Sequence, residues 1–486
     1  MQSQSVSRWA QDTFGRAQLN DVRRGRRLVA MAAAAARRPS GKVAAVFDRD
    51  EERAGAYDFL ENAAIRADAL ASVLFDATAS RARAGDTVYV VVDGTALTLT
   101  DKAGSRGLGP VGSPNRAARG LQVMNAFAVT SDGVPLGLID QIYWTRDEVE
   151  LMPKNERTRR NQKRPFEEKE CANFVRAARS AVDRLAKSKA RVCVVIDREA
   201  DNSDILFALG RLDCDFIVRS KYDRRVEQPS SLTLRETMDR QPVLGRHAVE
   251  IGRTGQRPAR RATVEVRSHR VTFQIRKDSS STREAGRLEL TAVSVTEVGS
   301  NEKDALDWLL YTNLPVTSLA EAENVVDAYR KRWRIEEFHR TWKQGDCNVE
   351  DAQLQSVEAL RKWATILAAV ATRIERLKYL ARNQPESPAE LELSADEIEV
   401  LKRDQASRGV KKKRIVPASP TLADVTRWIA ELGGWIDQKG NGPPGATTIG
   451  RGLERLSHMT HALRLRKSAR SRPRTIRLGS KGKPQG

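Results

Sequence analysis

Residues 87–93 read Thr-Val-Tyr-Val-Val-Val-Asp, and residues 191–197 read Arg-Val-Cys-Val-Val-Ile-Asp. Each stretch is a short apolar run rich in β-branched residues, which is typical of a buried strand, and each ends in aspartate. In open α/β sheets, the carboxyl end of a buried strand borders the crevice where ligands bind. One such aspartate is as often a turn residue or a helix cap. Two of them, on strands that could be neighbours, indicate an acidic site that contains Asp93 and Asp197.

The segments around these two strands predict the fold class. Two further strands, at 121–130 and 135–144, are joined by the turn Ser-Asp-Gly, and a basic loop at 154–164 follows them. Helical and strand patterns then alternate, with helices at 166–186 and 203–212 and a last strand at 215–219. This order is that of an α/β, ribonuclease H-like core. Residues 222–300 alternate polar and apolar residues and predict an inserted antiparallel β-domain.

The core is expected to lie between helical N- and C-terminal domains. The predicted domains are a helical N-terminal domain (1–68), the α/β core (69–383), a helical C-terminal region (384–466) and a basic disordered tail (467–486). A strong helix is predicted from 320 to about 344.

This helix supplies a candidate third carboxylate. Residues 329–343 read Tyr-Arg-Lys-Arg-Trp-Arg-Ile-Glu-Glu-Phe-His-Arg-Thr-Trp-Lys. At about 100° per residue, Tyr329, Arg332, Glu336 and Lys343 fall on one narrow face, and Glu337 points about 100° away from Glu336. Glu336 is therefore the better candidate, although a solvated helix face would also carry a glutamate.

The spacing of these four residues resembles the signature of the insertion-sequence-four family of bacterial DDE transposases. The resemblance extends over nearly the whole chain, through Gly-Ala-Tyr at 55–57, Asp-Arg-Glu-Ala-Asp at 197–201, Phe-Ile-Val-Arg-Ser-Lys at 216–221 and Leu-Gly-Gly at 432–434. It implies that Asp93, Asp197 and Glu336 are the metal-binding catalytic triad. It also implies paired transposon ends, held by a homodimer that forms through the last helices.

The chemistry of the reaction supports the same triad. Breaking a phosphodiester without a covalent enzyme intermediate needs an activated water or 3′-hydroxyl and a stabilised leaving oxygen. Two Mg²⁺ ions roughly 3.5–4 Å apart do both, and hard divalent ions prefer carboxylate oxygens. We therefore expect two Mg²⁺ per site, with Mn²⁺ as a substitute. The four cysteines are scattered without a close pair, which argues against a zinc site.

Other residues are candidates for DNA contacts. Arg332 can grip a phosphate bidentately and Lys343 can neutralise one, while Tyr329 could donate a hydrogen bond. The resemblance implies a hairpin intermediate with a flipped base stacked on Trp308, assisted by Arg219. Trp308 taken alone is more simply a core residue. In the N-terminal domain the candidates for end recognition are Arg23, Arg24, Arg27 and Lys42, and a solvated basic face would look identical.

Charge and composition agree with a nucleic-acid partner. The net charge is +21, from 84 Lys plus Arg against 63 Asp plus Glu, and such a protein is attracted to polyanions. The longest apolar run is too short to span a bilayer, so no membrane partner is expected. No export signal is evident, and we expect a cytoplasmic, nucleoid-associated protein.

The sequence thus predicts a cut-and-paste transposase that binds inverted terminal repeats and joins them to target double-stranded DNA. Two alternatives remain open. One is a nuclease with the same core that cuts DNA without strand transfer. The other is a non-catalytic DNA-binding regulator derived from a transposase.

Overall fold

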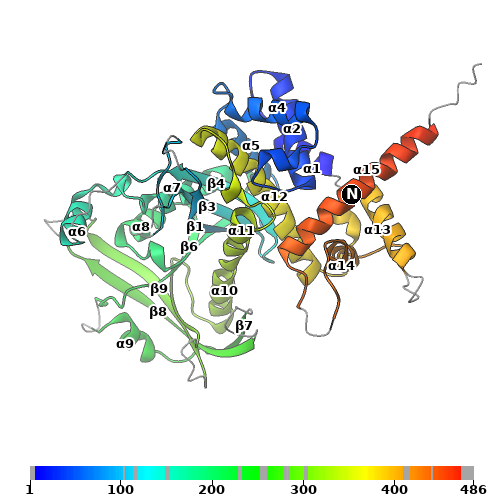
Figure 1. Ribbon diagram of the computed structural model, residues 1–486. Coiled ribbons are helices and arrows are strands. Elements are labelled where there is room, and N and C mark those ends of the chain that lie inside the picture. Colours follow the sequence, from blue (N-terminus) through cyan, green and yellow to red (C-terminus); the bar gives the residue numbers. More distant parts are fainter. Residues whose placement is uncertain are drawn as a thin grey trace, which may run out of the picture.

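The computed structural model describes residues 6–101, 104, 106–112, 118–147, 154–227, 232–251, 260–277, 282, 284–299, 305–408, 416–438 and 442–471. Figure 1 shows a twisted central sheet with helices packed on it, the N-terminal helices at one end of the molecule and the C-terminal helices beside them. The strands are β1 (Thr87–Leu99), β2 (Gly109–Pro110), β3 (Arg119–Val129), β4 (Pro135–Trp144), β5 (Arg191–Ile196), β6 (Asp215–Arg219), β7 (Gly245–Ile251), β8 (Arg260–Ile275), β9 (Gly286–Glu297) and β10 (Asp307–Thr312). The helices are α1 (Val6–Phe14), α2 (Val22–Arg37), α3 (Val43–Val46), α4 (Asp50–Glu61), α5 (Ala67–Ala79), α6 (Lys154–Lys163), α7 (Ala172–Leu185), α8 (Ser203–Leu209), α9 (Leu234–Asp239), α10 (Leu319–Arg330), α11 (Trp333–Lys343), α12 (Val357–Asn383), α13 (Ala395–Arg408), α14 (Leu422–Leu432) and α15 (Ala446–Ser471).

The described strands form one ten-stranded sheet in the order β2-β3-β1-β5-β6-β10-β9-β8-β7, with β4 paired to β3. Strands β1, β5 and β6 are parallel, and β3 and β4 run antiparallel beside β1. This mixed α/β sheet with helical flanks is the ribonuclease H-like core predicted from the sequence. The inserted strands β7 to β9 are antiparallel as expected, but they are not a separate sheet, because β10 joins them to β6.

Strand alternation assigns each side chain to a face. On β1, Val88, Val90 and Val92 pack with the cluster that contains the buried residues of α7 and α8. Val91 faces the opposite side, with the cluster that includes α11 and α12. Because side chains alternate along a strand, Asp93 belongs to the α11 side.

Strand β1 is longer than the sequence predicts. The apolar run stops at Asp93, yet the strand continues to Leu99, because β3 offers an antiparallel partner as far as the Leu99–Arg119 pair. The parallel ladder with β5 does stop at the Val92–Ile196 pair. Asp93 therefore lies inside its strand, at the point where β5 ends.

The helix predicted at 320–344 is two helices, with a break at Lys331 and Arg332. The Arg332 amide bonds the Tyr329 carbonyl at 3.0 Å and the Arg334 amide bonds the Lys331 carbonyl at 2.9 Å, so tighter turns replace the α-helical bonds. The two helices lie over different strands of one face of the sheet, with α10 against β8, β5 and β6 and α11 against β1 and α12.

The segment predicted as a basic loop at 154–164 contains a helix, α6. It has no apolar residue and therefore no hydrophobic period, but its Lys, Glu, Arg and Gln residues favour helix. At the other end of the chain, α15 reaches Ser471, within the segment predicted to be a disordered tail. Residues 472–486 of that predicted tail lie outside the described residues, as does the basic run 411–414.

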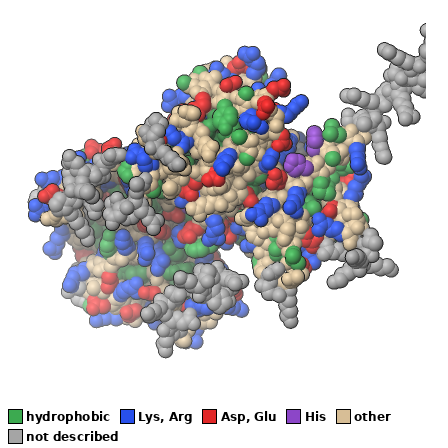
Figure 2. All heavy atoms as spheres, viewed as in Figure 1, with side chains coloured by type: hydrophobic (Ala, Val, Ile, Leu, Met, Phe, Trp, Pro, Cys, Tyr) green, Lys and Arg blue, Asp and Glu red, His purple; other side chains and the backbone are tan. Residues whose placement is uncertain are grey.

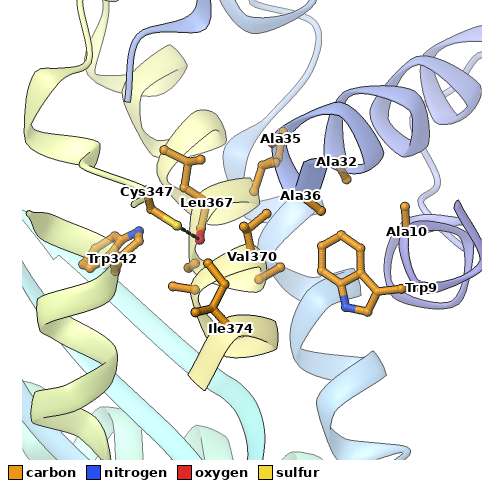
Figure 3. Packing of buried hydrophobic residues seen from close by; sticks show 14 of the residues in the cluster. Trp9, Ala10, Ala32, Ala35, Ala36, Trp342, Cys347, Leu367, Val370 and Ile374 are labelled. Atoms are coloured by element: carbon orange, nitrogen blue, oxygen red, sulfur yellow. Dashed lines mark hydrogen bonds between the residues drawn. The ribbon is translucent and has the colours of Figure 1, made fainter. Parts of the chain in front are cut away.

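Helix α12 joins the N-terminal helices to the core. In Figure 3, Ala32, Ala35 and Ala36 of α2 lie beside Leu367 and Val370 of α12, and the core residues beyond α12 include Trp342 and Cys347. Helix α5 occupies most of the segment between the N-terminal helices and β1, and it packs on β4 and α12.

Polar bonds reinforce this junction. The buried ammonium of Lys362 donates to the carbonyls of Leu60 and Asn62 at 2.8 and 2.9 Å, at the end of α4. The Trp363 indole donates to the Gly41 carbonyl at 2.8 Å. The N-terminal helices and the sheet are thus attached to one another without a free linker.

Candidate active site

Asp93 and Asp197 are neighbours across two parallel strands. The ladder of β1 and β5 ends at the Val92–Ile196 pair, and each aspartate is the next residue of its chain. Asp197 also caps the short 3₁₀ helix Arg198–Ala200, since its carboxylate accepts the Glu199 amide at 2.8 Å. The helix-cap role that a lone aspartate suggests is therefore real, and it coexists with a position beside Asp93.

Helix α11 places Glu336 on the same side of the sheet. Arg332, which precedes the helix, donates from Nη2 to Glu336 Oε1 at 2.6 Å. Its Nη1 lies 4.0 Å from Asp93 Oδ2. The guanidinium is only 15% exposed and thus bridges the carboxylates of the helix and the strand.

The electrostatics of this cluster are those of crowded acids. Burial and the nearby Asp197 carboxylate raise the pKa of Asp93 to about 7, against the opposing effect of Arg332. Glu336 contributes further in the same direction. A cation in addition to Arg332 would therefore stabilise the ionised forms of these carboxylates.

Carboxylate oxygens are the donors that Mg²⁺ and Mn²⁺ prefer, so the chemistry of the three acids suits a divalent ion. As the side chains stand, no group of three His, Cys, Asp or Glu residues in the described part of the chain is close enough to hold one. Glu336 is engaged by Arg332 instead. Gathering the three acids around an ion requires that Arg332 release at least part of its contact.

Tyr329, Trp308 and Arg219 form a second group beside the acids. The rings of Trp308 and Tyr329 meet edge to face with centroids 5.2 Å apart. Trp308 is half-buried, whereas Tyr329 is buried. A side-chain hydrogen bond links Tyr329 to Arg219, and Arg219 Nη2 also donates to the Asp307 carbonyl at 3.3 Å. Arg219 follows the Ile196–Val218 pair of β5 and β6, so it is in register with Asp197.

Lys343, at the end of α11, lies over β1. Its Nζ donates to Thr95 Oγ1 at 3.1 Å and is 3.7 Å from Glu350. Thr95 is on the same face of β1 as Asp93 because the two residues are two apart. The four signature residues were predicted to share one face of a single helix. They lie instead on two helices and the turn between them, from Lys343 over β1 to Tyr329 beside Trp308 of β10.

The N-terminal candidates differ in their freedom to reach DNA. Arg23 is 84% exposed and pairs with Asp21 at 2.9 Å. Arg24 is half-buried and donates to the Leu19 carbonyl at 3.2 Å. Arg27 is exposed but its guanidinium lies against Gly55, where a Cβ would be 2.2 Å from Nη1. Lys42 precedes α3 and is exposed, with no side-chain cap bond.

Two residues of α11 were not assigned from the sequence. His339 is buried and hydrogen-bonds Asn125, the residue opposite Asp93 on β3. Trp333 is 44% exposed, and the Arg332 guanidinium lies 5.9 Å from its ring centroid. Helical periodicity would have shown that Trp333 lies outside the apolar stripe, but it could not show the helix break that places the ring beside Arg332.

Comparison with known protein families now adds to this geometry. Residues 6–65 match the model for transposase DNA-binding, residues 172–373 match the transposase DDE domain, and residues 369–473 match the transposase Tn5 dimerisation domain. The chain has the domains of a DDE transposase. The match to the DDE domain includes Asp197 and Glu336, whereas Asp93 precedes it and is tied to the site by its register with β5.

The two outer domains are thus of the types that bind DNA and form dimers in transposases. Figure 2 shows Lys and Arg side chains spread over the visible face and mixed with acidic ones, so the net charge of +21 is not confined to one patch there. None of the described helices is long and apolar enough to cross a membrane.

Proposed function

We propose that this protein is a cut-and-paste transposase of the insertion-sequence-four family that uses Asp93, Asp197 and Glu336 to hold two Mg²⁺ ions. The observation that carries the proposal is the register of Asp93 and Asp197 at the end of the β1–β5 ladder, with Glu336 linked to Asp93 through Arg332. Mn²⁺ can substitute, because it accepts the same oxygen donors. When bound, the ions activate the attacking oxygen and stabilise the leaving one.

The side chains around the triad then act on the DNA. Arg332, freed from Glu336, binds the phosphate at the cleavage position, and Lys343 binds a neighbouring phosphate along β1. In hydrolysis the oxygen of water bonds to phosphorus and the bond from phosphorus to the 3′ oxygen breaks, which leaves a 3′-hydroxyl. That hydroxyl attacks the opposite strand, closes a hairpin and expels the flanking strand. Trp308, with Arg219 and Tyr329 behind it, stacks the base displaced at the hairpin.

Hairpin opening and strand transfer follow at the same site. A second water opens the hairpin, and the restored 3′-hydroxyl attacks target DNA in an exchange of one phosphodiester for another. No high-energy cofactor is needed, because each transfer step forms and breaks one phosphorus–oxygen bond. The N-terminal helices bind the inverted repeats, through Arg23, Arg24, Arg27 and Lys42, and two protomers pair through the C-terminal helices.

The triad is tested with Asp93→Asn, Asp197→Asn and Glu336→Gln on DNA that carries the element's ends. Each variant should lose cleavage in Mg²⁺ or Mn²⁺ and keep end binding, because the change removes a metal ligand and leaves the N-terminal helices intact. Glu337→Gln is the matched control, since Glu337 pairs with Arg334 and Lys378 away from Asp93. A triad variant that cuts at near wild-type rate would show that its residue is not a ligand.

The same assay separates the alternatives. Cleaved ends that join to target DNA identify a transposase. Cleavage without joining, with hairpins absent, identifies a nuclease. Specific end binding by a wild-type protein that cuts under no metal condition identifies a regulator.

A further inference from the structure

A buried carboxylate outside the triad organises the loop that follows β6. The side chain of Asp201 has no exposed surface, and its Oδ2 accepts the backbone amides of Lys221 and Tyr222 at 2.6 and 3.0 Å and the Ser220 hydroxyl at 3.3 Å. Its other oxygen pairs with Arg224, whose Nη2 also donates to the Asp201 carbonyl at 3.2 Å. Residues 220–224 are therefore held in one conformation by bonds to a charged acceptor, which are stronger than neutral ones.

This loop lies on the catalytic edge of the sheet. Strands β5 and β6 are parallel up to the Ile196–Val218 pair, so Arg219 is level with Asp197 and the loop begins one residue beyond it. The Ser220 amide also donates to the Leu309 carbonyl at 2.7 Å, which fixes the loop beside Trp308. The loop is thus a direct continuation of the proposed hairpin-binding group.

What the loop presents to solvent is an aromatic ring and a cation. Tyr222 is 53% exposed, and its ring centroid lies 5.6 Å from Lys221 Nζ and 5.5 Å from the Arg224 guanidinium. Arg224 is neutralised by Asp201, whereas the exposed Lys221 has no ion-pair partner among the residues that the structure describes. A fixed, exposed aromatic ring beside a free cation is the combination that binds nucleotides, by stacking on the base and attracting the phosphate.

We propose that Tyr222 and Lys221 bind an unpaired nucleotide of the DNA strand next to the cleavage position, the ring stacking on its base and the ammonium binding its phosphate. Asp201 is the positioning residue of this site. The site takes an unpaired nucleotide because a base inside a duplex has both faces covered by its neighbours, whereas strand opening at an end exposes one. The proposal rests on the proposed function, since it requires DNA at the Asp93–Asp197 edge.

The test uses the full-length protein and two DNA ends labelled with 2-aminopurine next to the cleavage position, without divalent metal so that nothing is cut. In one DNA the labelled base is paired, and in the other two mismatches leave it unpaired. Wild-type protein should quench the unpaired probe. Tyr222→Ala should lose the quenching and bind the mismatched DNA about 5- to 30-fold more weakly, while its affinity for paired DNA changes less than about twofold. Tyr222→Phe, the matched control, should behave as wild type because stacking does not use the hydroxyl.

Lys221→Ala should keep the quenching and reduce the salt slope of binding by about one ion. Asp201→Asn should lose the quenching although Tyr222 is present, and its melting temperature shows whether the fold is kept. If Tyr222→Ala binds both DNAs as wild type does, or loses affinity equally for both, the proposal is wrong. Cleavage of paired ends by the wild type in Mg²⁺ tests the proposed function separately, and that result does not depend on Tyr222.

Discussion

His339 on α11 accepts a hydrogen bond from Asn125 on β3, with 2.9 Å between Nε2 and Nδ2, and Asn125 is the residue paired with Asp93 across the sheet. The bond continues as a chain, because Gln141 donates to Asn125 at 2.7 Å and the Tyr143 hydroxyl donates to Gln141 at 2.7 Å. Buried polar groups fix geometry strongly, since a displaced partner loses its bond without gaining one to water. This chain of hydrogen bonds therefore sets the distance between α11 and the sheet. Glu336 lies on α11 about one turn before His339, and Asp93 lies on the strand paired with Asn125.

Asn125→Leu should slow DNA cleavage at least tenfold while end binding stays within about twofold of wild type. The change breaks the hydrogen-bond chain and removes the Asn125 partner of His339 Nε2 and of Gln141 Nε2, at a cost of about 1–3 kcal/mol in the free energy of unfolding. Thr372→Val is the matched control, because it removes a comparable buried bond, to the Ala368 carbonyl at 2.9 Å, away from the acids. Single-turnover cleavage and urea unfolding measure the two effects. Equal cleavage rates in both variants would mean that the chain is only structural.

The charge state of His339 predicts a pH dependence of stability. Burial, then the cations of Lys343 and Arg332, lower its pKa to about 3, below the 6.5 of an unfolded chain. Because the folded state keeps His339 neutral, its contribution to the free energy of unfolding is fully present above pH 6.5. As the pH drops from 6.5 toward 3, this contribution falls by about 1.4 kcal/mol per pH unit.

His339→Phe removes that titration, so the stability advantage of wild type over the variant should shrink by about 2 kcal/mol between pH 6.5 and 5. The measurement is urea unfolding of both proteins across this range. The carboxyls with raised pKa values, Asp93, Asp140, Asp215 and Asp346, are present in both proteins and cancel in the difference. A difference that does not vary with pH would show that His339 can be protonated in the fold.

Local patterns predicted much of this molecule. The boundaries of β4, β5 and β6 agree with the sequence because each is an apolar run closed by turn residues, and the two aspartates could be singled out because the runs end on them. Three features depend on contacts between residues that are distant in the sequence. Strand β1 extends past Asp93 only because β3 pairs with it, and the break at Lys331 lies where the chain passes from α10, packed on β5, β6 and β8, to α11, packed on β1 and α12. The bond of His339 joins residues 214 positions apart, and no local pattern carries such a contact.

Arg332 and a divalent ion should compete for the triad. Arg332 donates to Glu336 at 2.6 Å and lies 4.0 Å from Asp93, so an ion held by these acids displaces part of a charge-assisted bond. Arg332→Ala should therefore bind Mn²⁺ about 5- to 10-fold more tightly in the absence of DNA, which corresponds to about 1 kcal/mol, and yet cleave DNA much more slowly. Electron paramagnetic resonance titration of Mn²⁺ measures the first effect. Weaker Mn²⁺ binding would show instead that Arg332 helps to assemble the metal site.

We expect base reading by α2 to rest mainly on Arg23, whose side chain is 84% exposed. Arg23→Ala should weaken binding to the correct end by about 5- to 100-fold, as expected for loss of a bidentate base contact, and binding to random DNA less than about threefold. Arg66→Ala serves as the control, since Arg66 is 75% exposed on the same domain. Equal loss on both DNAs with a smaller salt slope would mean that Arg23 touches only phosphate. Filter binding at several salt concentrations decides between the two.

The last prediction concerns which protomer cuts which end. Excising an element requires cutting at two ends, and under the proposed function we expect each protomer to recognise one end and cut the other. The N-terminal helices share a hydrophobic cluster with α12, and Lys362 bonds the end of α4. The end-binding helices therefore cannot swing to another subunit on a linker. If cleavage is in trans, the relation between recognition and catalysis must be set by how two rigid protomers dimerise.

Mixing two defective proteins tests this arrangement. One is Glu336→Gln, which binds ends but lacks a triad ligand, and the other is Arg23→Ala with Lys42→Ala, which has an intact triad but impaired end recognition. Lys42 is preferable to Arg24 as the second change. Arg24 donates a hydrogen bond to the Leu19 carbonyl, so its loss would also disturb the fold, whereas the Lys42 side chain is exposed and makes no cap bond. In the trans arrangement, heterodimers should restore cleavage at the end bound by the Glu336→Gln protomer, although neither protein cuts alone. The expected rate is at most about half that of wild type, because random mixing of two proteins yields about half heterodimers. Heterodimers that form, as shown by differently tagged protomers, and yet leave that end uncut would mean that each protomer cuts the end it binds.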